Sequence, residues 1–293
     1  MKMTLGCVSC SVRQIEHVLE QSALEGAAKM RCMQELLSDL ASIDMELSPP
    51  AVAAAFHAKI KARLGDDDPY REIKRQSTAL ALKLYPEMRA RVKASPDPLM
   101  ASLKAAIAGN IIDYGARRGA SDGEVFESLE RVFDEPMDGE FARMFRDDAS
   151  RARSILYVGD NAGEIVFDRL LLEELGPARV TFAVRGGPII NDATMEDARA
   201  SGLEGTVRIV TTGTMLPGID APASSDEFLN ALALADMIIL KGQGNLETAI
   251  DGELDGLAKK GARMYFLLKV KCDYVASRLG KKLHDIAFLA HTV

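Results

Sequence analysis

The residues of this chain that are best suited to chemistry follow one short apolar run. Residues 154–158 are mostly apolar and predict a strand, and Asp160 and Asn161 come directly after it, beyond a single glycine. A turn of small residues then leads into an amphipathic run that starts at Glu164 and predicts a helix. Ligands of open parallel sheets bind beyond the carboxyl ends of the strands. Hard oxygen ligands beside a helix N-terminus predict a divalent cation together with a phosphate.

Four more predicted strands also end in polar or glycine-rich segments. These segments are Arg185-Gly186-Gly187-Pro188 followed by Asn191-Asp192, then Thr211-Thr212-Gly213-Thr214, Lys241-Gly242-Gln243-Gly244-Asn245, and Lys269-Val270-Lys271-Cys272. If the sheet is parallel, all of them lie along one edge with Asp160 and Asn161. Their convergence is more informative than any single motif.

The residue types at this edge indicate metal-assisted phosphoester hydrolysis. Asp160, Asn161 and Asp192 could supply three oxygen ligands to Mg²⁺ or Mn²⁺ and leave positions for water and phosphate. Lysines and backbone N–H groups of the glycine-rich turns would hold the phosphate oxygens. Glu164 could orient the water or a sugar hydroxyl.

Each motif alone also fits a simpler role. Asp160-Asn161 and Asn191-Asp192 are good capping and turn sequences. The loop that begins at Lys241 is similar to a nucleotide-binding glycine loop, but a lone G-x-G is weakly specific. Two other functions therefore stay open: a nucleotide- or SAM-dependent transferase, and a non-enzymatic metabolite- or metal-binding protein.

The cysteines and histidines do not form a complete metal motif. Cys7 and Cys10 are a C-x-x-C pair, and a zinc site would need Cys32 with His17 or His57, so thiols without a catalytic role are favoured. His284 and His291 are seven residues apart and could share a helix face, which without a third ligand indicates ordinary structure.

The first 150 residues contain no convincing strand and predict an all-helical bundle or cap. The predicted helices are 11–24, 26–42, 51–64, 68–92, a helix that carries 105–114, 124–133 and 140–146. Asp68-Pro69 and Asp97-Pro98 would each open a helix with a cap followed by proline.

Residues 151–293 predict an α/β domain that carries the metal site. The predicted strands are 154–158, 179–184, 206–211, 237–240 and 263–268, and the helices are 164–175, 192–200, 226–235 and 246–259. Such alternation is typical of a Rossmann-like, mostly parallel sheet with helices on both faces.

The amino-acid composition limits the classes of binding partner that this chain could have. The chain has 293 residues, 36 Lys and Arg against 43 Asp and Glu, and a net charge of −7. This balance argues against nucleic acid or an anionic membrane as the main partner. We find no membrane span and no signal peptide, so we expect a cytoplasmic protein; a homo-oligomer stays open.

Several ordered motifs together resemble the DUF89 family of damage-control phosphatases. They are Gly159-Asp160-Asn161-Ala162-Gly163-Glu164-Ile165-Val166-Phe167-Asp168, the segment from Val184 to Thr194, Lys241-Gly242-Gln243-Gly244-Asn245, Leu268-Lys269-Val270-Lys271-Cys272, Asp68-Pro69-Tyr70 with Lys74, and Ala108-Gly109-Asn110 with Asp113. The match covers nearly the whole chain, and the N-terminal C-x-x-C is similar to that of the short, stand-alone archaeal and bacterial members.

The resemblance implies an N-terminal helical region packed on a Rossmann-like domain, and a phosphatase for small phosphorylated metabolites such as sugar phosphates. It implies a divalent metal (Mn, Mg, Co or Ni) at Asp160, Asn161 and Asp192. The phosphate-binding positions of the family map onto Lys271 and Asn245, with Lys241, Gly242 and Glu164 nearby. Asn110 and Asp113 match a motif that is expected to face the active site. We therefore expect Asp160, Lys271 and Glu164 to be catalytic.

Overall fold

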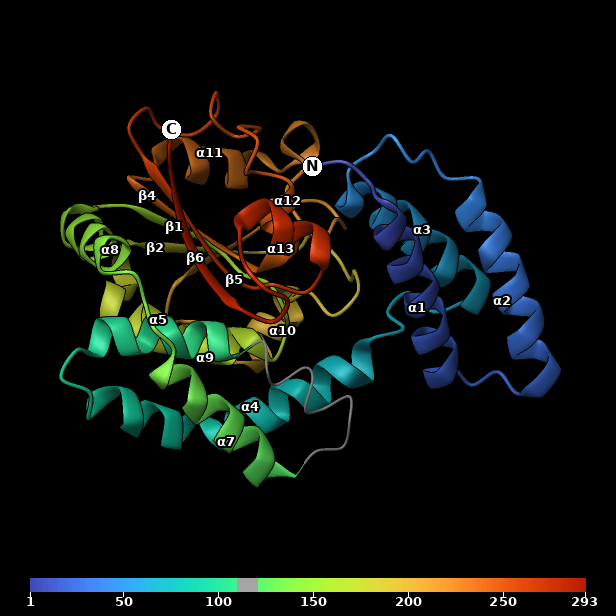
Figure 1. Ribbon diagram of the computed structural model, residues 1–293, viewed down its shortest axis with the longest axis horizontal. Helices are drawn as coiled ribbons and strands as arrows, with labels where there is room; N and C mark the ends of the chain where they lie inside the picture. Colours follow the sequence, from blue (N-terminus) through green and yellow to red (C-terminus); the bar gives the residue numbers. More distant parts are fainter. Residues whose placement is uncertain (110–120) are drawn as a thin grey trace.

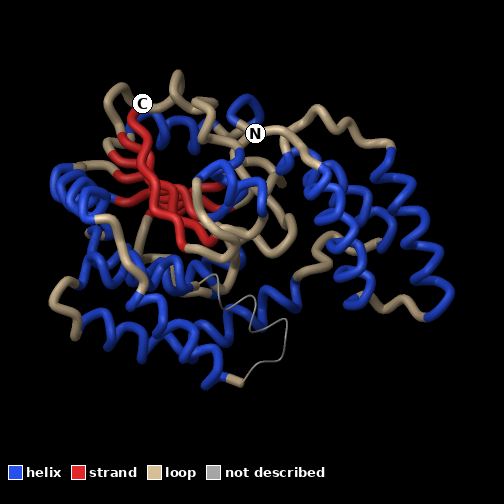
Figure 2. Tube along the Cα trace, viewed as in Figure 1, coloured by secondary structure: helices blue, strands red, loops and turns tan. Residues whose placement is uncertain are grey.

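A computed structural model describes residues 1–109 and 121–293 of the chain (Figure 1). Its centre is a six-stranded sheet in the order β3-β2-β1-β4-β5-β6, with β6 antiparallel to β5 and the other neighbours parallel. The strands are β1 (Ile155–Val158), β2 (Val180–Val184), β3 (Arg208–Thr211), β4 (Met237–Lys241), β5 (Arg263–Lys269) and β6 (Ile286–Thr292). Figure 2 shows this sheet enclosed by helices. The predicted α/β class, with a mostly parallel sheet, is confirmed.

The strand order reverses between β1 and β4. From β1 the chain moves outward to β2 and β3, and it then returns to place β4 on the other side of β1. At such a reversal the two connections leave the sheet in opposite directions, which opens a crevice at the carboxyl ends of the strands. The segments that follow β1 and β4 both begin there.

Both faces of the sheet are buried, so the strands are apolar on both sides. Ile155 and Tyr157 of β1 belong to one core, and Leu156 and Val158 belong to the other. Successive side chains of a strand point to opposite faces, so a continuous apolar run is what a doubly covered sheet requires. The covering segments are α9 (Glu164–Leu175), η1 (Pro177–Arg179), α10 (Met195–Ala200), η2 (Ala221–Ala223), α11 (Asp226–Leu234), α12 (Gly242–Glu247) and α13 (Asp273–Leu279).

The helices before the sheet form two groups. The first is a three-helix arm, α1 (Leu5–Gln21), α2 (Gly26–Ala41) and α3 (Pro49–Leu64), which has its own core and lies to the right of the sheet in Figure 1. The others are α4 (Arg71–Lys93), α5 (Pro98–Ala108), α7 (Asp122–Asp134) and α8 (Gly139–Arg151). Of these, α4 and α5 pack on α9, and α5 and α8 share a core with the sheet. The division of the chain into domains at residue 150 stays a prediction.

Two predicted helix starts have different outcomes. Asp97 caps α5 by accepting a hydrogen bond from the N–H of Met100, as its sequence predicts. Asp68 does not cap α4, which begins at Arg71; its carboxylate instead pairs with the buried ammonium of Lys74, 2.8 Å away.

One prediction for the C-terminal part is wrong, and one strand there was not predicted. The helix predicted at 246–259 does not form, because α12 already ends at Glu247 and turns follow it. His284 and His291 do not share a helix face, because His284 has a positive φ of 73° and His291 lies within the edge strand β6, which is absent from the predicted strands. Being half exposed, β6 lacks the continuous apolar run of the inner strands.

Candidate active site

The three predicted cation ligands come together at the strand reversal. Asp160 and Asn161 follow β1, and Asp192 follows β2 after a seven-residue segment. Asn161 and Asp192 form an antiparallel backbone bridge, and the N–H of Ala193 donates to the carbonyl of Asp160 at 2.7 Å. Backbone pairing between two strand ends therefore makes the three side chains neighbours.

The carboxylates here are buried and close to one another. The side-chain amide of Asn161 donates to Asp160 and to Glu164, both at 3.0 Å. Burial raises the pKa of Asp160 well above its usual range, and the neighbouring carboxylates of Asp192 and Glu164 raise it further. Burial also raises the pKa of Asp192. Like charges held this closely favour the binding of either protons or a cation.

Arg185 holds Asp192 in place and was not among the predicted site residues. Its side chain is 1% exposed, and Nε donates to the Asp192 carboxylate at 2.7 Å. The two remaining nitrogens donate to the carbonyl of Gly218 at 2.8 Å and to the side-chain oxygen of Asn245 at 3.1 Å. Its position directly after β2 was the available signal, since a charged residue rarely follows a buried strand without a partner.

Asn245 joins the ends of β1 and β4. Its amide nitrogen donates to the carbonyl of Lys241 at 2.6 Å and more weakly to that of Gly159 at 3.3 Å. Its oxygen accepts from Arg185. Because both the nitrogen and the oxygen of this side chain are hydrogen-bonded to the protein, Asn245 links the ends of β1 and β4.

Lys241 lies beneath the acidic cluster and is fully buried. Its ammonium donates to the carbonyl of Ala106 at 2.9 Å, to Glu164 at 2.7 Å and to Asp168 at 2.5 Å. Each of the three N–H groups of this ammonium therefore has one acceptor. Asp168, which closes the first family motif but was not among the predicted site residues, also accepts from the hydroxyl of Tyr157 at 2.7 Å. Burial raises the pKa of Asp168 to about 6 against the opposing effect of Lys241.

Gly242 lets the backbone approach Asp160. It has a φ of 82°, and a Cβ at this position would lie 2.1 Å from an oxygen of the Asp160 carboxylate. Glycine supplies both the left-handed conformation and the space. Gly109 plays a similar part at the end of α5, where a Cβ would lie 2.9 Å from the Cα of Glu164.

Lys271 is the exposed cation of the site. Its backbone N–H donates to the side-chain oxygen of Gln243 at 3.0 Å, which fixes the segment after β5 beside α12. Its charge acts to lower the pKa of both Asp160 and Asp192, so the ammonium lies within electrostatic reach of the pair. Asn110 and Asp113, the other predicted substrate contacts, lie outside the described residues.

The donor set fits a hard divalent cation. Asp160 and Asp192 supply carboxylates, and Asn161 supplies an amide oxygen that makes no hydrogen bond within the described residues. Mg²⁺ and Mn²⁺ prefer such oxygen ligands, whereas zinc prefers histidine and cysteine.

No group of three or more His, Cys, Asp or Glu side chains that could hold a metal occurs in residues 1–109 and 121–293. Cys7 and Cys10 lie on α1, where Cys7 is half-buried and Cys10 is exposed; both are free thiols.

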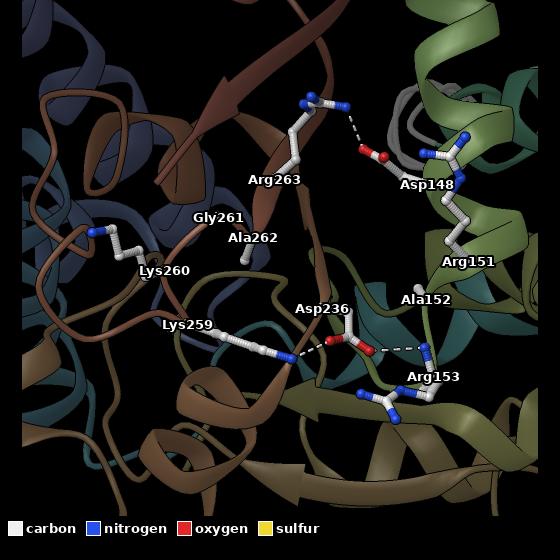
Figure 3. Close-up of a pocket in the computed structure, with 10 residues that line it drawn as sticks. All are labelled: Asp148, Arg151, Ala152, Arg153, Asp236, Lys259, Lys260, Gly261, Ala262 and Arg263. Carbon is white, nitrogen blue, oxygen red and sulfur yellow. Dashed lines mark hydrogen bonds and ion pairs between the residues drawn. The ribbon is translucent and has the colours of Figure 1, made fainter.

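A separate hollow lies at the opposite, amino ends of the strands (Figure 3). Its volume is about 280 Å³, and Asp236 and Asp148 in its wall are paired with Lys259 and Arg263. None of the predicted site residues lines it. In the described part of the chain, no helix is long and apolar enough to cross a membrane.

Comparison with known proteins finds relatives over nearly the whole chain. Residues 3–286 match the family described as the damage-control phosphatase ARMT1-like domain. The chain is 34% identical over 283 residues to damage-control phosphatase PH1575 of Pyrococcus horikoshii, covering 95% of this chain and 94% of that protein. It is 32% identical over 291 residues to a damage-control phosphatase of Archaeoglobus fulgidus, covering 98% of each.

The fold agrees as well. The crystal structure of PH1575, a DUF89 family protein, superposes with a TM-score of 0.85 at 31% identity and covers 98% of both chains. The sequence matches and the shared fold extend over almost the whole length. This chain therefore belongs to the damage-control phosphatase family with the ARMT1-like (DUF89) domain.

Proposed function

We propose that this protein is a divalent-cation-dependent phosphatase that hydrolyses small phosphorylated metabolites such as sugar phosphates or damaged phosphometabolites. Family membership supports a phosphatase, and therefore a hydrolase, role. The buried acidic cluster at the strand reversal carries the finer proposal, because Asp160 and Asp192 have raised pKa values that a bound cation would offset.

In this proposal Asp160, Asn161 and Asp192 hold the cation. When bound, Mn²⁺, Mg²⁺, Co²⁺ or Ni²⁺ would polarise a phosphoryl oxygen and acidify a bound water. Arg185 orients Asp192 through its 2.7 Å hydrogen bond, and its charge lowers the pKa of that carboxyl against the effect of burial. Gly242 leaves room for the Asp160 carboxylate.

Lys271 and Glu164 act on the substrate side. The exposed ammonium of Lys271 attracts the phosphate oxygens and offsets the negative charge that develops on them. The carboxylate of Glu164 accepts hydrogen bonds from Asn161 and Lys241, so it is held in one orientation from which it can align the attacking water.

Lys241 and Asn245 take positioning roles in this proposal. Each makes three hydrogen bonds to protein groups, which leaves neither side chain a donor with which to bind phosphate. Lys241 orients Glu164 from below, and Asn245 holds the ends of β1 and β4 at a fixed spacing.

A phosphatase screen tests the proposal. Metal-free protein is assayed against a panel of sugar and cofactor phosphates with Mg²⁺, Mn²⁺, Co²⁺ or Ni²⁺ added singly. We expect phosphate release that requires an added cation and that falls sharply in Asp192→Asn. Equal release with and without chelator, or no release with any substrate and metal, would contradict it.

A covalent route through Asp160 would leave a different trace. Direct attack by water gives no aspartyl-phosphate, and we expect none to be trapped during turnover. A phosphorylated Asp160 peptide, recovered by acid quench and mass spectrometry, would replace the direct-hydrolysis step with a nucleophilic one.

A further inference from the structure

The turn that delivers Asp192 contains a strained residue. Ile190 has a φ of 46°, in the left-handed region that glycine and asparagine adopt readily and β-branched residues avoid. The N–H of Asp192 donates to the carbonyl of Ile189 at 3.1 Å, so Ile190 occupies the second position of a tight four-residue turn. A positive φ at that position normally selects Gly, Asn or Asp, and an isoleucine there costs about 1–3 kcal/mol.

Contacts from the three-helix arm can stabilise the strained backbone conformation of Ile190. The side chain of Ile190 packs against the arm's core, which includes Phe56 and Ile60 of α3. The ammonium of Lys61, also on α3, donates to the carbonyl of Pro188 two residues earlier. Both contacts join the arm to a segment that lies more than 120 residues later in the chain.

The turn's other end is fixed to the site. The carbonyl of Asn191 accepts from the N–H of Ala162 at 3.0 Å, and Asp192 pairs with Asn161. A relaxation of Ile190 toward a negative φ would rotate the chain immediately before these contacts. The direction of the Asp192 carboxylate therefore depends on the backbone at Ile190.

We propose that Ile190 is a positioning residue: its packing on the three-helix arm holds the strained turn, orients Asp192, and so couples docking of the arm to cation binding. This inference rests on the cation site proposed above. Because coupling is reciprocal, a cation that favours the observed turn also stabilises the docked arm.

Two substitutions at position 190 separate this role from simple packing. Ile190→Ala removes the packing but keeps the strain, whereas Ile190→Gly removes the packing and tolerates the positive φ. If only packing mattered, glycine would be the worse substitution, since it removes one more carbon and adds backbone freedom. If the turn's strain matters, alanine is the worse one.

The test measures Mn²⁺ affinity of the metal-free full chain by calorimetry. We expect Ile190→Ala to weaken Mn²⁺ binding about 10-fold or more, and Ile190→Gly to bind several-fold more tightly than Ile190→Ala. Ile43→Ala is the matched control, since Ile43 packs on the same arm core but follows α2 within the arm itself, and we expect it to bind Mn²⁺ like the unmodified chain. Affinity in Ile190→Gly equal to or weaker than in Ile190→Ala would overturn the inference.

Hydrogen exchange supplies a second readout that does not require the position 190 variants to fold. We expect Mn²⁺ to slow amide exchange in α1–α3 of the unmodified chain, and Lys61→Met to reduce that effect. Lys59→Met on the same helix, whose lysine pairs with Asp39, is the control. Unchanged exchange in the arm would refute the coupling. An unmodified chain that binds no cation would instead refute the proposed function.

Discussion

Replacing Lys241 by methionine should reveal how much the buried charge network beneath the site contributes to folding. Methionine keeps a similar length and shape but removes the ammonium that binds Glu164 and Asp168, whose side chains are also buried. Removing one partner of a buried ion pair typically costs 3–5 kcal/mol, because the other charge is left uncompensated. We expect a loss of about 3–5 kcal/mol in the free energy of unfolding near pH 7, a large share of the 5–15 kcal/mol typical of folded domains.

The loss should depend on pH. Asp168 has a pKa raised to about 6 even beside Lys241, and without that cation its pKa can only rise further. A carboxyl whose folded pKa is raised loses stability as the pH rises from its unfolded value through the folded one. At pH 5 the group is largely protonated in the variant, so the difference from the unmodified chain should shrink between pH 7.5 and pH 5.

Urea denaturation of both chains at the two pH values measures the effect. Lys241→Met/Asp168→Asn should recover part of the stability, because it removes one of the unpaired carboxylates. The control is Lys271→Met, at an exposed lysine, which should change the unfolding free energy by no more than about 1 kcal/mol while lowering kcat/KM. A Lys241→Met chain within about 1 kcal/mol of the unmodified protein would refute the reasoning from burial.

Three further predictions concern the site itself. Asp192→Asn should lower phosphatase activity more than about 100-fold while near-ultraviolet circular dichroism is retained; full turnover would remove Asp192 from the ligand set. Gly242→Ala should destabilise the chain by about 1–3 kcal/mol and weaken Mn²⁺ binding, because the new Cβ meets Asp160; Gly256→Ala, in open space, should do neither, and equal melting temperatures would contradict this. The melting-temperature increase on adding Mn²⁺ should grow from pH 5 to pH 8, since raised pKa values make protons compete for Asp160 and Asp192; a constant increase would exclude that competition.

The sheet was predictable because buried parallel strands leave a local signal. Five apolar runs bounded by glycine or polar residues were each recognised, and the strands begin and end within about two residues of the predicted limits. The edge strand β6 was missed, because its exposed positions break the apolar run. The helix predicted at 246–259 was wrong, because the turns that follow α12 carry enough apolar residues to imitate a helical pattern.

Helix starts show where local signals compete. Asp192 and Thr194 are both good capping residues, and the structure uses Thr194, whose side chain and N–H interact with Asp197 in a capping box. Asp192 is thereby left for the acidic cluster. Both choices satisfy the same local rule, so packing against the end of β1 decides between them.

Local sequence patterns were enough to predict which residues stand at the carboxyl ends of the strands, since strand and turn signals depend on near neighbours. Which of these residues join the acidic cluster and which lie beneath it depends on long-range packing. Lys241 meets Glu164 across 77 residues of sequence, and Arg185 meets Asn245 across 60. Whether a charged side chain is buried and fully bonded or exposed depends on such distant partners, and no local pattern records them.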